Sequence, residues 1–475
     1  MDSGELTGMV VYPRSETEWE GVAYALARGP AGKVLLVQGD ATGFEGETHG
    51  DATLCPLTGV NAAVLRSRLP WLCPQPLGLT TSAGCGDRLG LATPGHIRAI
   101  RDVDGIVPIF AQQSMRENAR TGRSPQDVVD DALWGLLQEG WTEPWGADAD
   151  HLKTTDEVAL CVSAGYTFYT IDPGDHVDNA AHAASLEVLG SEIHNLPWRE
   201  LEDTPEALHA RYLERSFAVE GIAMEFDRAT LARAVAKYGR AIAHTVSLYR
   251  YLDSLSDRFE LEMSVDETDT PTLAEEHFFI ASELKRLGVQ WVSLAPRYVG
   301  RFEKGVDYIG DLGEFESELA KHAAIARAVG PYKLSIHSGS DKFSIYPLLA
   351  RHTRGLVHLK TAGTSYLEAV RAVAQVDPAF FRDMVTCAME HYPIDRATYH
   401  VSADLARVPP PAALTDAELP ALLDQFDARE VLHVTFGSVL DRFHDRLLRT
   451  LDEHEEAHYS ALQAHFDRHL RPLVE

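Results

Sequence analysis

Cysteine is scarce in this chain, and its cysteines show no pattern of pairing. A chain of 475 residues can bury a core that needs no cross-links. An odd number of thiols without a CxxC pair is typical of a reduced, cytoplasmic protein. The five thiols belong to Cys55, Cys73, Cys85, Cys161 and Cys387.

Long apolar runs are missing as well. No uninterrupted run approaches the roughly 18 residues of a membrane-spanning helix. Asp2 and Glu5 stand where a secretory leader would carry basic residues. With 45% hydrophobic and 24% charged residues, the composition is that of a globular protein. We therefore expect a soluble protein that makes no membrane contact.

Basic residues are in deficit. The chain has 43 lysines and arginines against 71 acidic residues, which gives a formal net charge of −28. A surface of that sign repels phosphate backbones and anionic lipids. We expect a small-molecule substrate and no nucleic acid as partner, and an anionic substrate would need a local cationic pocket. The oligomeric state, a homo-oligomer included, is left open.

Several common catalytic motifs are absent or out of context. The sequence has no Walker A loop and no Gly-x-Ser-x-Gly elbow. The segment Gly84–Gly90 (GCGDRLG) is similar to a dinucleotide loop, but its third glycine comes one residue late and a strand-like pattern follows. His454–His458 (HEEAH) matches the HExxH zinc motif, yet it lies in a highly charged terminal helix. We interpret it as a chance match on a solvated face.

What the chain does contain is an alternation of short β-rich runs with helical stretches. Two such helices are Ser124–Glu139, opened by Ser-Pro, and Phe315–Ala328. This rhythm is typical of βα units and a parallel sheet. The strands expected after residue 80 are Arg88–Thr93, Val107–Gln112, Ala147–Lys153, Thr167–Asp172, Phe259–Asp266, Gln290–Ala295, Tyr332–His337, Leu356–Thr361 and Ala397–Ser402.

These candidates predict an α/β fold, a (β/α)8 TIM-type barrel spanning residues 81–408. They are one too many for eight strands, so one lies outside the closed sheet or is not a strand. Residues 1–80 are expected to form an N-terminal α/β addition. It would comprise the apolar runs Met9–Tyr12 and Lys33–Gln38 around a helix-like stretch, Glu16–Arg28.

Two further segments fall outside the barrel pattern. Residues from about 179 to 258 show only helical patterns, such as Thr230–Leu255, and are much longer than a standard barrel connection. We interpret them as a helical insertion. Residues 409–475 begin with a proline-rich linker, followed by the capping-box pattern Thr415–Glu418. They are expected to form C-terminal helices that pack on the barrel.

Polar clusters fall at the carboxyl ends of the predicted strands, where the loops of a barrel converge. Asp150 and His151 end one strand, His337 ends another, and His358 belongs to the next. Neighbouring strands lie about 4.8 Å apart, so histidines at such ends can meet at one ion. Imidazole suits Zn, Ni, Co or Fe. A single histidine is more often structural. Because His151, His337 and His358 stand at equivalent strand ends, the three together predict a metal site.

A carboxylate facing Asp150 would complete an acid and base pair for proton transfer. The strand Phe259–Asp266 places Glu262 and Asp266 on one face, and Glu267 follows at the mouth. The alternative is an ion pair with a nearby arginine or lysine. The residues alone give only a slight preference for Glu267 over Asp266 or Glu262.

Long blocks surround these strand ends, and they are far more specific than a short motif. They run from about Cys85 to Ala369 and include CGDRLGLATPGHI, PIFAQQSMREN, WGADADHLKT, YTIDPGDHVD, SVDETDTPT, VSLAPRYVGRFEKGVDYIGD, KLSIHSGSDKFSIYPLL and HLKTAGTSYLEA. Together they resemble the tagaturonate epimerase family of bacterial hexuronate catabolism. A weaker likeness surrounds Tyr399.

The resemblance implies interconversion of D-tagaturonate and D-fructuronate by a metal-dependent enzyme that needs no nucleotide cofactor. It implies His151, His337 and His358 as ligands of a divalent ion (Zn, Ni, Co or Mn), with Asp150 as proton acceptor and Glu267 as proton donor. An acidic substrate also needs cationic partners. By position near strand ends these are expected to be Arg88, Lys342 and Lys360, while Gln112 and Gln113 would bind sugar hydroxyls; surface charge, ion pairing and ordinary packing are the alternatives.

The chemistry of this substrate pair limits the mechanism. The two keto acids differ at a carbinol carbon that is β to the ketone, so its C–H bond is not acidified. We therefore expect retro-aldol cleavage and re-addition, with the metal as Lewis acid for the enediolate. Alternatives are a fructose/tagatose epimerase, a metal-dependent aldolase, and a sugar-acid binding protein without turnover.

Overall fold

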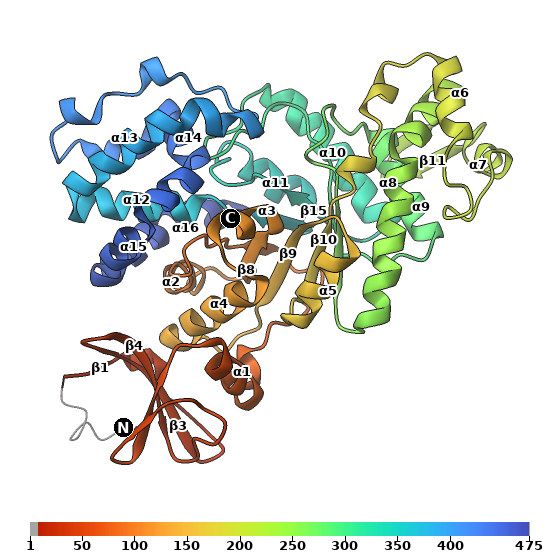
Figure 1. Ribbon diagram of the computed structural model, residues 1–475. Helices are drawn as coiled ribbons and strands as arrows, with labels where there is room; N and C mark the ends of the chain where they lie inside the picture. Colours follow the sequence, from red (N-terminus) through yellow and green to blue (C-terminus); the bar gives the residue numbers. More distant parts are fainter. Residues whose placement is uncertain (1–7, 475) are drawn as a thin grey trace.

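A closed barrel of eight parallel strands forms the centre of the computed structural model, which describes residues 8–474 (Figure 1). The sheet closes because the last strand pairs with the first in parallel register. The predicted TIM-type barrel is therefore confirmed. In order around the barrel the strands are β7 (Ser82–Gly84), β8 (Val107–Ser114), β9 (Gly146–Leu152), β10 (Phe168–Ile171), β13 (Glu260–Ser264), β14 (Ser293–Ala295), β15 (Lys333–Ile336) and β16 (Val357–Lys360).

Two predicted strands were wrong. Arg88–Thr93 is a loop, because the Asp87 carboxylate accepts hydrogen bonds from three main-chain N–H groups within it and holds it in a turn. Ala397–Ser402 begins in a 3-10 turn and continues as a loop outside the barrel. The first barrel strand is instead Ser82–Gly84, whose small residues carry almost no strand signal.

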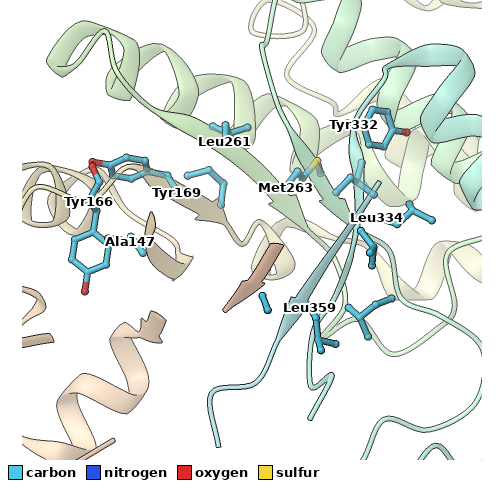
Figure 2. Packing of buried hydrophobic residues seen from close by; sticks show 14 of the residues in the cluster. Ala147, Tyr166, Tyr169, Leu261, Met263, Tyr332, Leu334 and Leu359 are labelled. Carbon is cyan, nitrogen blue, oxygen red and sulfur yellow. The ribbon is translucent and has the colours of Figure 1, made fainter. Parts of the chain in front are cut away.

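Alternation along the strands separates the apolar core from a polar interior. On β13, Leu261 and Met263 alternate with Glu260, Glu262 and Ser264, and all five are buried. Successive side chains of a strand point to opposite faces. Figure 2 shows the two apolar residues in a hydrophobic cluster with residues of other strands. The polar side chains are thereby left for the inside of the barrel.

Helices cover the outside of the barrel, and their ends follow ordinary capping rules. The predicted helices near residues 124–139 and 315–328 are confirmed, the first with a capping box between Ser124 and Asp127. The helices of this layer are α2 (Thr93–Ile100), α3 (Met115–Thr121), α4 (Pro125–Glu139), α5 (Thr155–Ser163), α9 (Ala274–Arg286), α10 (Leu312–Val329), α11 (Tyr346–Thr353) and α12 (Thr364–Val376).

The N-terminal segment is an antiparallel sheet followed by one helix, α1 (Gly59–Arg68). The predicted helix Glu16–Arg28 was wrong, since β2 and β3 occupy it. Its alanines favour a helix, but Tyr24 and Leu26 alternate with them and are buried. The strands are β1 (Val10–Val11), β2 (Thr17–Trp19), β3 (Val22–Gly29), β4 (Gly32–Gln38), β5 (Glu47–His49) and β6 (Ala52–Pro56).

The insertion between β10 and β13 is mostly helical, as predicted, and ends with the long helix α8 (Arg228–Leu255). It also contains a hairpin that the helix-only expectation lacked. Glu220 and Gly221 form its two-residue turn with φ values of 44° and 88°, the conformation such turns require. The remaining elements are α6 (Leu186–His194), α7 (Pro205–Tyr212), β11 (Ser216–Val219) and β12 (Ile222–Glu225).

The C-terminal helices pack on one side of the barrel (Figure 1) and form a second hydrophobic cluster with α12. The HExxH match is not on a solvated face. Glu455 pairs with Arg28 of the N-terminal sheet, Glu456 pairs with Arg98 of α2, and His458 is buried. No helix within residues 8–474 has the length and hydropathy to cross a membrane. The helices are α13 (Pro378–Asp395), α14 (Phe426–Val434), α15 (Phe436–Glu453) and α16 (Glu455–Leu470).

Candidate active site

A polar cavity lies at the carboxyl end of the barrel strands. Barrel enzymes place their chemistry at this end. Most of the lining comes from β8, β9, β15 and β16 and the loops after them. The lining residues are Arg88, Gln112, Ser114, Arg116, Glu117, Asp150, His151, Lys304, Gly305, His337, Ser338, Ser340, Lys360, Ala362, Gly363, Tyr399 and His433.

Two histidines turn one ring nitrogen each toward a common point. His151 Nε2 and His337 Nδ1 are 3.3 Å apart. Behind them, His151 Nδ1 lies 3.1 Å from Asp172 Oδ2, and His337 Nε2 lies 2.6 Å from Glu262 Oε1. A carboxylate behind each imidazole is typical of metal-ligating histidines, because it fixes the orientation of the ring and, once an ion replaces the proton of the inner nitrogen, its tautomer.

The local electrostatics favour a cation at this point. Burial alone would lower the pKa of both imidazoles. Asp150 beside His151 and Asp266 beside His337 outweigh burial and raise their pKa values to about 10 and about 9. Asp150, His151 and His337 each offer a donor atom within 4.8 Å of the others. Imidazole nitrogens suit a divalent transition-metal ion, so the two histidines fit the expected group.

Asp150 is held ionised at the floor of the cavity. Its Oδ1 lies 2.7 Å from Lys360 Nζ, and its Oδ2 accepts a hydrogen bond of 3.0 Å from Gln112. Burial would raise the pKa of Asp150, but Lys360 and the two histidines hold it well below its usual range. Asp150 is therefore ionised in this site, and its role as proton acceptor stays a prediction.

Lys360 is a cation that is already neutralised. Besides Asp150, its Nζ contacts Asp148 Oδ2 at 2.8 Å and Glu262 Oε1 at 3.0 Å. These contacts raise the pKa of Lys360 well above its usual range despite burial. Lys360 lines the cavity, but the three carboxylates of the protein already neutralise its charge. It is therefore a poor partner for the carboxylate of a substrate.

His358 does not join the other two histidines. The register of β16 pairs it with Ser335 and Ser82, which lie deeper in the barrel. Its Nδ1 is 2.9 Å from Ser82 Oγ, and its Nε2 is 3.9 Å from Asp148 Oδ2. The position level with His337 is taken by Lys360, two residues and about 7 Å further along the strand. His358 thus belongs to the layer beneath the cavity.

Glu267 stands at the mouth of the site. It pairs with Arg116 at 2.9 Å, and its carboxylate, the Asp172 carboxylate and the His151 ring have donor atoms within 4.8 Å of one another. The alternative carboxylate, Asp266, is tied to His337 at 3.2 Å. Of the acids after β13, Glu267 is the more accessible to a substrate, with 38% of its side chain exposed.

The two adjacent glutamines point to opposite sides of β8. Gln112 lines the cavity and donates to Asp150. Gln113 instead donates to Thr121 and accepts from Arg123, away from the lining. Strand alternation allows only one of two neighbouring residues to face the site, and that residue is Gln112.

The remaining predicted cations have different surroundings. Lys342 is fully buried and donates to the main-chain carbonyls of Glu303, Val306 and Ser340, so it braces a loop outside the lining. Arg88 does line the cavity, where its Nε and Nη2 bind Glu117 at 2.9 and 2.6 Å.

Sequence reasoning missed Lys304, Tyr399 and His433, all of which line the cavity. Lys304 lies within one of the family-like blocks, and Tyr399 lies within the weaker likeness. His433 has no local signal, because it comes from the C-terminal helix α14 and reaches the site only through the tertiary fold.

Similarity to known proteins extends over almost the whole chain. The sequence profile of a family described as tagaturonate epimerase matches residues 12–473. A tagaturonate/fructuronate epimerase of Thermotoga maritima is 43% identical over 472 residues, which cover 98% of this chain and 96% of that protein.

Solved structures give the same result. The native crystal structure of a fructuronate-tagaturonate epimerase from Cohnella laeviribosi matches with a TM-score of 0.94 at 41% identity, covering 98% of this chain and 97% of that chain. Its complex with two glycerol molecules also gives a TM-score of 0.94. The chain therefore belongs to the tagaturonate epimerase family and is an isomerase of the epimerase type.

Proposed function

We propose that the protein interconverts D-tagaturonate and D-fructuronate by inverting carbon 4, with a divalent ion (Zn, Ni, Co or Mn) held by His151 and His337. The observation that carries the proposal is the pair of imidazole nitrogens aimed at one point in a polar cavity, each backed by a carboxylate. The names of the matching relatives support the substrate pair.

The reaction needs a route that does not rely on an acidic C–H bond, since carbon 4 is β to the ketone at carbon 2. In a retro-aldol step Asp150 takes the proton of the carbon-4 hydroxyl, and the C3–C4 bond breaks. The electron pair of that bond passes to the C1–C3 fragment as an enediolate, and carbon 4 becomes an aldehyde. A divalent ion bound at this site would supply Lewis acidity toward the oxygen atoms that gain negative charge.

Inversion follows when the aldehyde presents its other face. The enediolate returns its electron pair to carbon 4, the C3–C4 bond forms again, and the new alkoxide takes a proton. We assign that proton to Glu267, because it stands at the mouth of the cavity near His151, on the loop after β13 and away from Asp150 on β9. Glu267 takes this proton from solvent at the exposed mouth, and Asp150 returns the proton that it accepted to solvent, so both carboxylates are restored. Two carboxylates acting on opposite faces are what an inversion of this kind requires.

The first experiment is NMR of D-tagaturonate with metal-reconstituted protein, with and without a chelator. Formation of D-fructuronate only in the presence of metal supports the whole proposal. Turnover that survives removal of all metal contradicts the metal role but not the substrate. Accumulation of three-carbon products in place of the epimer indicates an aldolase, and turnover of D-tagatose alone indicates a neutral ketose as substrate.

A further inference from the structure

The cavity has a second, cationic side that takes no part in the metal site or in the proton transfers proposed above. Arg88, Lys304 and His433 line it, and they come from three separate parts of the chain. The loop after β7 carries Arg88, the loop after β14 carries Lys304, and α14 carries His433. We call this group the cationic subsite.

Two members of the cationic subsite bear polar atoms that lack a partner among the described residues. Arg88 is 4% exposed and its Nη1 makes no hydrogen bond, although the other two nitrogens bind Glu117. His433 is 2% exposed and its Nδ1 makes none either. Buried polar atoms are rarely left unpaired in native proteins, so unpaired atoms on residues that line a cavity point to a ligand.

The subsite is built rigidly. The Arg88 guanidinium stacks on the Phe436 ring at 3.8 Å, which fixes the direction of its free nitrogen. His433 approaches the main chain so closely that a Cβ on Gly363 would lie 1.9 Å from its Nε2. Gly363 has an ordinary backbone conformation, so glycine is needed here for space alone. A preorganised polar group costs little entropy when the ligand arrives.

One cation of the subsite has no carboxylate in direct contact among the described residues. Glu117 compensates Arg88. Lys304 donates to Ser338 Oγ at 2.6 Å, and within residues 8–474 no carboxylate forms an ion pair with it. Lys304 also lowers the pKa of Glu117 and Glu267 from a longer distance, so it is a cation near carboxylates but not paired with one. On the side of the cavity with His151 and His337, carboxylates outnumber cations. Three carboxylates surround the single lysine there, Lys360.

We propose that Arg88, Lys304 and His433 bind the carboxylate of the substrate, with Lys304 and the free Arg88 nitrogen supplying charge and His433 a hydrogen bond. This inference rests on the proposed substrate class. Binding of the carboxylate at the cationic subsite orients the keto acid, so that its ketone points toward His151 and His337.

The subsite also determines whether cleavage ends in epimerisation. Breaking the C3–C4 bond leaves the carboxylate on the C4–C6 aldehyde, which is the fragment that must turn over. An aldehyde bound through its carboxylate cannot escape, yet it rotates about the C4–C5 bond and presents its other face to the enediolate. The cationic subsite therefore retains the fragment that an aldolase would release.

The test compares D-tagaturonate with D-tagatose, which carries an alcohol where the acid has its carboxylate. Binding is measured by calorimetry, so it needs no turnover and is independent of the NMR assay for the proposed function. For Lys304→Met we expect affinity for D-tagaturonate to fall roughly 10- to 100-fold, the loss typical of a hydrogen bond between charged groups. Affinity for D-tagatose should stay within about twofold.

Three further variants separate this role from a structural one. Lys304→Arg should restore most of the binding, whereas Gly363→Ala, which displaces His433, should repeat the selective loss. Lys321→Met is the matched control, since it removes one positive charge from the surface helix α10 and should change neither affinity. Trapping with an aldehyde-selective hydrazide should recover more three-carbon aldehyde from Lys304→Met than from wild type.

Two results would overturn the subsite. One is a wild-type protein that binds the acid no better than the neutral sugar. The other is a Lys304→Met protein that loses affinity for both sugars equally, or for neither. Failure of the wild type to form D-fructuronate while it still prefers the acid would instead contradict the proposed reaction and leave the subsite standing.

Discussion

At the scale of single residues, Asp150 gives the sharpest test of the chemistry. Asparagine keeps the shape of Asp150 and one of its two contacts, because its single amide oxygen accepts from either Gln112 or Lys360 but not from both. It cannot accept a proton from the substrate. For Asp150→Asn we expect turnover to fall about 10²- to 10⁴-fold, the usual contribution of a positioned base. Initial rates by NMR measure the fall. Bound metal, measured by mass spectrometry, should be retained, and its loss would instead make Asp150 a metal ligand.

The three histidines differ in depth, and this predicts different outcomes on mutation. His151→Ala and His337→Ala should each lose bound metal and turnover together. His358→Ala should keep the metal, because His358 contacts Ser82 and Asp148 beneath the cavity. It should lower the free energy of unfolding by roughly 1–3 kcal/mol, as loss of a buried polar partner does. Metal content and denaturant unfolding separate the two effects, and metal loss in His358→Ala would restore it as a ligand.

The sequence predicts which strand ends form most of this site, but it does not predict how deep in the barrel each side chain lies. Asp150, His151 and His337 end predicted strands, and that pattern alone suffices to bring them together at one end of a barrel. Lys360 and His358 both point inward from β16, and only the pairing register determines which is level with His337. The register depends on both paired strands, so it cannot be predicted from the sequence of one strand alone.

At the scale of elements, the errors arose where side-chain contacts outweighed local pattern. Arg88–Thr93 alternates like a strand, yet Asp87 folds it into a loop through main-chain hydrogen bonds. Ser82–Gly84 has no strand pattern, yet pairing on both sides makes it the first barrel strand. Long periodic segments such as α8 were predictable, because many residues contribute to the same pattern.

Helix α16 depends on buried neutral histidines, and this makes its packing sensitive to acid. Burial lowers the pKa of His458 to about 4 and that of His469 to about 3, and it lowers the pKa of His96 on the adjacent α2 to about 4. The unfolded chain protonates near pH 6.5 and the folded one far lower. Stability is therefore complete above about pH 6.5 and is lost as the pH falls toward 4.

Each of these histidines should cost about 2 kcal/mol of unfolding free energy at pH 5 relative to pH 7. Urea unfolding across that range measures the loss. His458→Gln removes one titrating group, so its unfolding free energy should depend less steeply on pH than that of the wild type. Equal slopes would show that His458 is not buried in its neutral form.

At the scale of the whole molecule, the active site is completed by parts of the chain that lie far apart in sequence. The barrel supplies Asp150, His151 and His337, while α14 supplies His433 and α15 supplies Phe436 beneath Arg88. The C-terminal helices therefore contribute to the site as well as to the core. Such long-range contacts could not be predicted from one sequence, because nothing near His433 marks it.

The net charge of −28 sets the field through which an anionic substrate approaches. Salt screens this long-range repulsion, with a Debye length of about 30 Å at 0.01 M and about 10 Å at 0.1 M. Contacts in the buried cavity are screened far less. Between these salt concentrations kcat/KM for D-tagaturonate should therefore rise by about two- to fivefold.

D-tagatose is the control, because an uncharged sugar does not respond to the field. Its affinity should be constant over the same range of salt. A fall in kcat/KM for the acid would mean that the cationic subsite extends its attraction beyond the cavity mouth. The local pocket would then determine the approach of the substrate, and the acidic surface would not.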